Sequence, residues 1–307
     1  MSVTRRSFLK HAGAGMVAAG VFSQPVWAAS ELALGSLRID SLSDGTLTLP
    51  PEFVFAPMPQ ADLAALLPEL GVAPGTLTPD CNVTLMRDGT NTVLFDAGSG
   101  SGFQASAGLL PDALDAVDVA PEDVTHIVFT HGHPDHLWGV LDDFDDPMFP
   151  AARHMMGRAE WDYWINPQTA ETIQQSRTTM ALGARRRLAA MEDRFSLFDD
   201  GDEILPGVAA RLTPGHTPGH MGFEIRSGSG ALMVVGDAIG NHHVAFARPA
   251  WRSGSDQDQD LGAKTRTALL DQLSADKMRL IGYHLPGGGI GHAEKTPDGY
   301  RFVPEGG

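Results

Sequence analysis

The sequence has little cysteine, little positive charge and no long apolar run. A single cysteine, Cys81, among 307 residues excludes an intramolecular disulfide and a cysteine-rich zinc finger. With 22 basic against 38 acidic residues the formal net charge is −16. This charge argues against nucleic acid or an anionic membrane as a partner, because like charges repel. No apolar stretch is long enough to serve as a membrane anchor.

What remains describes an ordinary globular chain. Hydrophobic residues make up 42% and charged residues 20%, which is enough to bury a proper core. The 35 glycines and 21 prolines indicate many turns and suit a sheet-rich fold with functional loops.

The first 28 residues read as an export signal. Arg5 and Arg6 precede Phe8, Leu9 and Lys10, a short apolar run covers 12–22, and small residues suited to cleavage end at position 28. The segment resembles a twin-arginine signal, which implies export in the folded state through the twin-arginine translocase. We therefore expect one domain over 29–307, located in the periplasm or secreted. A homodimer is compatible with the sequence.

Short apolar runs bounded by turn residues predict strands, and apolar residues at helical spacing predict helices. The expected strands are 37–42, 46–49, 82–87, 92–95, 125–130, 195–198, 209–213, 222–226, 231–235, 279–283 and 300–303, with a hairpin joining 82–87 to 92–95. Helices are expected over 61–70, 169–194 and 261–273. This mixture predicts an α+β layered fold.

The most informative segment follows the expected strand 125–130. His131, His133, Asp135 and His136 lie within six residues, in a loop that Gly132 allows to bend tightly. Four potential ligands are too many for one tetrahedral zinc with an open catalytic position. Two metal ions sharing the loop are the simpler interpretation.

This His-x-His-x-Asp-His pattern resembles the signature of the metallo-β-lactamase superfamily, whose fold is an αββα four-layer sandwich. The resemblance identifies three further ligands: His216 after Thr-Pro-Gly, Asp237 at a strand end, and His284 at a late strand end. It implies that His131, His133 and His216 hold one ion, that Asp135, His136 and His284 hold the other, and that Asp237 bridges them. Imidazole and carboxylate ligands favour zinc, with iron, manganese or cobalt also compatible.

The roles of two further residues, Asp96 and His220, are not fixed by the sequence. Asp96 matches a superfamily position that accepts a hydrogen bond from a ligand imidazole, or it simply forms a turn. His220 repeats the Thr-Pro-Gly-His pattern of His216, and the resemblance places it behind the ligands.

The chemistry implied is hydrolysis of a small molecule by a hydroxide shared between two metals, with Asp135 and Asp237 as the catalytic carboxylates. Members of the superfamily that hydrolyse antibiotics usually lack the bridging aspartate, so the resemblance with Asp237 present argues against antibiotic hydrolysis. The C-terminal segments 284–292 and 299–304 resemble the methyl parathion hydrolase group, whose members act on lactones, aryl esters and sometimes phosphotriesters. The expected pocket walls are Phe53, Phe55, Trp138, Trp161, Tyr163 and Trp164.

Two alternatives stay open. One is a mononuclear iron thiol or persulfide dioxygenase on the same fold, which would leave part of the second ligand set unused. The other is a non-catalytic periplasmic zinc-binding protein.

Overall fold

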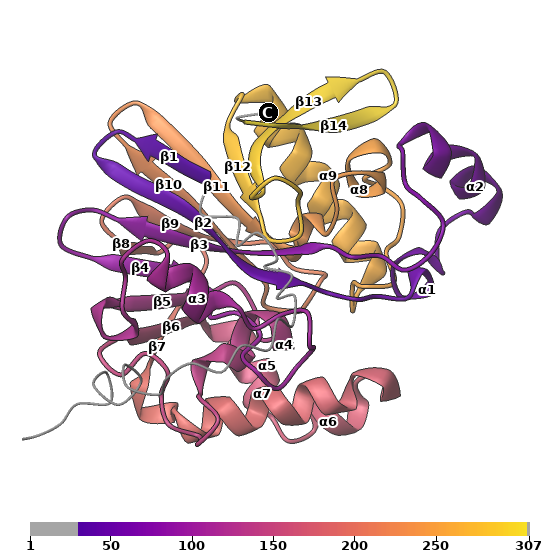
Figure 1. The fold of residues 1–307 in the computed structure, drawn as a ribbon. Coiled ribbons are helices and arrows are strands. Elements are labelled where there is room, and N and C mark those ends of the chain that lie inside the picture. The colour runs from indigo at the N-terminus through magenta and orange to yellow at the C-terminus, as the bar shows by residue number, and fades with distance from the viewer. Residues whose placement is uncertain (1–29, 306–307) are drawn as a thin grey trace, which may run out of the picture.

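The computed structural model describes residues 30–305, so the expected export signal lies outside the described residues. Two seven-stranded sheets stack face to face (Figure 1). The first sheet contains, in spatial order, β1 (Ser30–Leu34), β2 (Leu37–Thr46), β3 (Asp80–Arg87), β4 (Thr92–Phe95), β5 (His126–Phe129), β6 (Arg153–Gly157) and β7 (Phe195–Phe198). The second contains β14 (Gly299–Pro304), β13 (Ile290–Thr296), β12 (Arg279–Gly282), β11 (Gly230–Gly236), β10 (Met221–Ser227), β9 (Val208–Leu212) and β8 (Glu203–Leu205).

Helices cover the outer face of each sheet. Figure 1 shows α5, α6 and α7 together on one side and α8 and α9 on the other. The helices are α1 (Pro51–Phe55), α2 (Gln60–Glu69), α3 (Leu110–Asp115), α4 (Pro134–Leu137), α5 (Arg158–Ile165), α6 (Thr169–Thr172), α7 (Thr178–Ala190), α8 (Val244–Ala247) and α9 (Gln259–Ala275). The layers therefore run helix, sheet, sheet, helix, which confirms the predicted αββα sandwich.

Alternation along the buried strands produces these layers. In β5, Val128 faces the core between the sheets, whereas Ile127 and Phe129 pack toward the helices. In β11, Val234 faces the intersheet core and Val235 packs with the residues of α9. Successive side chains of a strand point to opposite faces, so a continuous apolar run is needed where both faces are covered.

Several expected elements match and others do not. The hairpin of β3 and β4 and the helices α2 and α9 are confirmed, and the Asp258 carboxylate caps α9 by accepting from the Leu261 N–H at 2.9 Å. The expected strand at 46–49 is wrong: β2 ends at Thr46, and Leu49 makes only an isolated bridge with Leu77. The strands β1, β6, β8 and β13 were not predicted.

The long helix expected over 169–194 is also interrupted. Between α6 and α7 the backbone at Ile173 and Gln174 is extended. The interruption turns Arg177 inward, where its Nη2 donates to the backbone carbonyls of Gly254 and Ser255 at 2.9 and 2.8 Å. A continuous helix would have lost this buried contact.

No helix among residues 30–305 has both the length and the apolar character needed to cross a membrane.

Candidate metal centre

The loop that follows β5 and the first turn of α4 carry four of the seven expected ligands. The strand β5 ends at Phe129 and α4 begins at Pro134, so His131 and His133 lie in the loop while Asp135 and His136 lie in the first turn of the helix. Gly132 separates the two histidines where a Cβ atom would come within 2.5 Å of the Trp164 ring. Only glycine fits this position without moving the indole.

The first cluster joins this loop to the turn before β10. His133 Nδ1 lies 2.9 Å from His131 Nε2 and 2.9 Å from His216 Nε2. All three rings are buried. Burial and the neighbouring imidazoles hold the pKa of His131 and of His133 well below the usual value. Both rings are therefore neutral and keep a lone pair for a metal.

The second cluster places ring nitrogens against carboxylate oxygens. His284 Nδ1 donates to the Asp80 backbone carbonyl at 2.7 Å, which turns its Nε2 toward the cluster. That nitrogen lies 3.3 Å from Asp135 Oδ2 and 3.3 Å from Asp237 Oδ2, and these carboxylates raise the pKa of the ring well above its usual value although burial lowers it. A ring nitrogen lone pair facing two carboxylate oxygens is repulsive unless a cation or a proton lies between them.

His136 repeats this arrangement. Its Nδ1 donates to Asp96 at 2.8 Å, which leaves its Nε2 facing Asp135 at 3.4 Å and Asp237 at 3.3 Å. The three carboxylates raise the pKa of this ring well above its usual value although burial lowers it. His136 Nε2 and Asp237 Oδ1 are buried without a hydrogen-bond partner among the described residues. Buried polar atoms of this kind are expected at a metal site, so the donor set fits a bound divalent cation.

Asp237 connects the two clusters. Its Oδ2 lies 3.3 Å from His216 Nε2 in the first cluster and 3.3 Å from His284 Nε2 in the second. It follows β11 directly, and its backbone N–H donates to His220 Nε2 at 3.0 Å. The structure thus brings all seven expected ligands together, and it uses His220 to orient the backbone of Asp237.

Residues behind the ligands fix their orientation. Asp96 also accepts from the Thr130 N–H at 2.7 Å and from its hydroxyl at 2.8 Å, which holds the His136 partner in place. Asp256 faces His216 Nδ1 at 3.4 Å and receives Arg266 Nη1 at 3.1 Å. Such partners set which ring nitrogen faces the metal.

Glu160 is a supporting residue that sequence reasoning missed. Its Oε1 accepts from the Gly132 N–H at 2.9 Å and from the Trp164 indole. Its Oε2 accepts from the Thr217 hydroxyl at 2.7 Å and from the Gly219 N–H at 3.0 Å. Burial raises the pKa of this carboxyl, and the four hydrogen bonds oppose that shift. The carboxyl joins the loop of His131 and His133 to the loop of His216, and the only signal in the sequence was an acid inside an aromatic segment.

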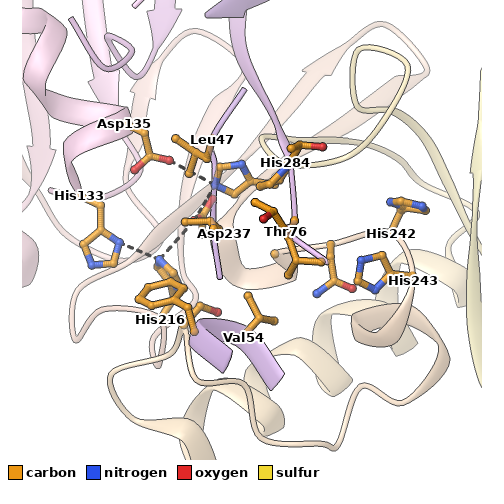
Figure 2. A pocket seen from close by; sticks show the side chains of 18 of the residues that line it. Leu47, Val54, Thr76, His133, Asp135, His216, Asp237, His242, His243 and His284 are labelled. Carbon is orange, nitrogen blue, oxygen red and sulfur yellow. Dashed lines mark hydrogen bonds and ion pairs between the residues drawn. The ribbon is translucent and has the colours of Figure 1, made fainter. Parts of the chain in front are cut away.

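A cavity of about 330 Å³ opens over the clusters (Figure 2). His133, Asp135, His216, Asp237 and His284 line its inner end, and much of its remaining wall is apolar. Apolar lining residues include Leu47, Leu49, Phe53, Val54, Leu77, Phe103 and Met180. A largely apolar cavity with a few polar groups at one end is typical of small-molecule sites.

The aromatic wall expected from the sequence needs correction, because only Phe53 among the six residues lines this cavity. Trp164 is fully buried against His133, and Trp161 and Phe55 belong to hydrophobic clusters. Trp138 lies beneath the Arg187 guanidinium, and the Tyr163 hydroxyl donates to Gln257. The loop after α2 supplies cavity wall instead, through Gly71, Val72, Ala73 and residues 76–79, which sequence analysis did not connect to the site.

Two solved structures superpose over most of this chain. AidC, a dizinc quorum-quenching lactonase in complex with the product N-hexanoyl-L-homoserine, superposes with a TM-score of 0.84 at 27% identity over 91% of this chain and 97% of that chain. The hydrolase AbOPH of the beta lactamase superfamily superposes with a TM-score of 0.83 at 27% identity over 90% and 97%.

Related sequences align with smaller parts of this chain. An uncharacterized protein of Mycobacterium tuberculosis is 30% identical over 61% of this chain and 79% of its own length. The N-acyl homoserine lactonase AttM of Agrobacterium fabrum is 28% identical over 41% of this chain and 46% of its own. The family model described as the metallo-beta-lactamase superfamily matches residues 78–284, a range that contains all seven expected ligands. This chain therefore belongs to the metallo-beta-lactamase superfamily.

Proposed function

We propose that this protein is a dinuclear metal-dependent hydrolase that opens lactones or cleaves aryl esters. The observation that carries the proposal is the position of Asp237, whose Oδ2 lies 3.3 Å from a histidine of each cluster. One carboxylate between two ligand sets is the arrangement expected for a pair of ions that share a ligand. The similarity to the dizinc lactonase AidC supports two zinc ions and a lactone substrate.

Each part of the chain has a distinct role in this reaction. Two divalent cations held by the clusters would supply hydroxide at neutral pH and polarise the carbonyl that is attacked. Asp237 sets the separation of the clusters. Asp135 lines the cavity with its Oδ2 3.3 Å from His284 Nε2, and would hold one of the cations together with His136 and His284. The apolar wall binds the acyl or aryl part of the substrate and excludes bulk water.

Metal analysis combined with a substrate panel tests the proposal. Zinc-loaded protein should contain two ions per chain and should hydrolyse lactones or aryl esters, with phosphotriesters as a secondary activity. One iron and no zinc per chain, with oxygen-dependent turnover of a persulfide, would favour the dioxygenase alternative. Two zinc ions without turnover of any lactone, aryl ester, thioester or phosphotriester would favour a zinc-binding protein.

We also propose that the protein is exported in its folded state. The support is the pair of arginines at positions 5 and 6, the apolar run after them and the single cysteine, which suits folding in a reducing compartment. Folding before export would allow the metals to be loaded inside the cell.

A further inference from the structure

One permanent cation lies at the wall of the cavity over the metal clusters. Arg177 is the only lysine or arginine among the described residues that line this cavity, and only 2% of its surface is exposed. Two other lining residues fix the position of its guanidinium: Cζ lies 5.3 Å from the centre of the Phe53 ring, and Nη2 donates to the Ser255 carbonyl at 2.8 Å. Burial, His216 and the charge of Arg177 together lower the pKa of His133, so this charge acts on the first cluster.

This cation has no counter-ion within ion-pair distance in the part of the chain that the structure describes. Nη2 donates to the backbone carbonyls of Gly254 and Ser255, and Nη1 is buried without a hydrogen-bond partner. A second buried arginine, Arg266, is paired with Asp256 at 3.1 Å. A guanidinium stays protonated when it is buried, so Arg177 keeps a charge that only neutral carbonyls contact. A buried charge without a partner is costly, and a bound anion would offset that cost.

The remaining ionisable groups of the lining do not neutralise Arg177. Asp135 and Asp237 belong to the metal clusters, and the two divalent cations expected there outweigh these two carboxylates. His242 and His243 line another part of the cavity, as Figure 2 shows. Burial lowers the pKa of His242 and, together with His242, lowers that of His243 to about 3, so both rings are neutral at physiological pH. The metal-loaded cavity therefore has an excess of positive charge in a chain whose formal net charge is −16, and such a cavity attracts anions.

We propose that Arg177 selects esters or lactones that carry a carboxylate away from the reacting carbonyl, so that hydrolysis gives a product with two carboxylates. This inference rests on the proposed function and names the substrate class of the same site. Water adds its oxygen to the acyl carbon, the ester C–O bond breaks, the alcohol oxygen takes up one proton and the new acid releases one to solvent. The guanidinium attracts the carboxylate that does not react, which would also give Nη1 an acceptor. A neutral group in that place would leave the charge of Arg177 unpaired and would bind more weakly.

Three substitutions separate the charge of Arg177 from its structural contacts. Arg177→Gln removes the charge but keeps an amide that can donate to the carbonyl of Gly254 or Ser255. Arg177→Lys keeps the charge. Arg187→Gln is the matched control, because Arg187 also lies over an aromatic ring, that of Trp138 at 4.3 Å, and donates to a backbone carbonyl at 3.1 Å, but it does not line the cavity. It removes the same charge from the chain.

The test measures binding of product analogues to the zinc-loaded protein by calorimetry at constant ionic strength. The ligands are the linear dicarboxylates from malonate to suberate and the monocarboxylates of equal chain length. In the wild type the best dicarboxylate should bind about tenfold more tightly than its monocarboxylate, a difference of about 1.4 kcal/mol. Arg177→Gln should abolish this preference and leave monocarboxylate affinity unchanged, whereas Arg177→Lys and Arg187→Gln should retain most of the preference.

Equal affinity of the wild type for the two ligand series would overturn the assignment, and this comparison decides by itself if a variant does not fold. An unchanged preference in Arg177→Gln, or an equal loss in Arg187→Gln, would also overturn it. Because the binding test requires no turnover, hydrolysis is followed separately with the nitrophenyl half-ester of the best dicarboxylate and the nitrophenyl ester of its monocarboxylate. If neither ester nor any lactone is hydrolysed while the preference depends on Arg177, the proposed hydrolase activity fails and the anion site stands.

Discussion

The Asp96 carboxylate holds His136 with its Nε2 toward the second cluster through a 2.8 Å hydrogen bond to Nδ1. Asp96 occupies the residue after β4 with φ of +70°, in the left-handed region that an aspartate tolerates better than most side chains. Its backbone N–H donates to the Val128 carbonyl at 3.0 Å, and its side chain accepts twice from Thr130. His136, in the helix that follows β5, is therefore oriented by a residue at the end of the neighbouring parallel strand β4.

Replacing Asp96 by Asn should weaken the second metal site selectively. If the amide nitrogen faces His136 Nδ1, two donors meet and the hydrogen bond is lost. If the amide oxygen faces it, the acceptor is neutral and holds the ring more weakly than the carboxylate does. We expect zinc affinity at one of two sites to fall by about 10- to 100-fold, measured by competition with a chromophoric chelator. Asp118→Asn makes the same chemical change at φ of +56° and should leave both affinities unchanged. Equal loss at both sites would contradict this role.

Replacing Asp237 by Ala should reduce the metal content from two ions per chain to one or fewer and lower turnover by more than about 1,000-fold. The substitution removes the oxygen shared by His216 and His284. The fold should remain, because the hydrogen bond to His220 uses the Asp237 backbone N–H. Metal analysis, turnover and far-ultraviolet circular dichroism measure the three effects, and full activity in the variant would rule out the bridging position.

Replacing Glu160 by Gln should destabilise the protein by on the order of 2–3 kcal/mol, because one amide nitrogen cannot accept the pair of hydrogen bonds that an oxygen now receives. The loss should be seen in urea unfolding and should be accompanied by weaker zinc binding at the first cluster, since Glu160 joins the loops that carry its ligands. The exposed Glu122→Gln variant is the control. Unchanged stability would show that the buried network tolerates the amide.

His154 should make the protein less stable in mild acid. The ring is buried, and neither of its nitrogens has a hydrogen-bond partner among residues 30–305. It contacts Phe129 and Phe195, and burial lowers its pKa to about 4. The unfolded chain binds a proton at His154 below about pH 6.5, whereas the folded protein does so only below about pH 4. Stability should therefore fall as pH decreases between these values, by up to about 3 kcal/mol from this residue.

The measurement compares the wild type with His154→Phe in urea unfolding between pH 7 and pH 4, with chelator present so that metal release does not contribute. The difference in unfolding free energy between the two proteins should shift in favour of the variant as pH falls. Parallel curves would mean that His154 does not account for acid sensitivity.

Removal of residues 2–28 should give a protein that folds in the cytoplasm, binds zinc and keeps its activity. The segment has the features of an export signal, so the metal clusters should not require it. Fractionation of cells that express the full chain, beside an Arg5→Lys, Arg6→Lys variant, tests the export proposal. Failure of the shortened chain to fold, or unchanged export of the double variant, would contradict it.

Local sequence was sufficient to identify the centre of the site. His131, His133, Asp135 and His136 follow one strand within six residues, and short-range backbone geometry alone brings them close together. The strands β5 and β11 could also be predicted, because a strand buried on both faces must be apolar at successive positions. The strand β6 could not be predicted from the sequence, because Arg153 and His154 interrupt its apolar pattern and its position depends on pairing with β5.

The cavity and its supports came from packing between distant segments. Phe53 reaches the cavity from α1, and the Glu160 carboxyl meets Gly132 and Gly219, which lie 28 and 59 residues away along the chain. His243 acquires a defined proton position only when the turn before α8 places the Val244 N–H against its ring. The spacing of residues along a helix or strand indicates which face each side chain occupies. The partner of that side chain depends on contacts between distant segments, which form only when the layers pack together.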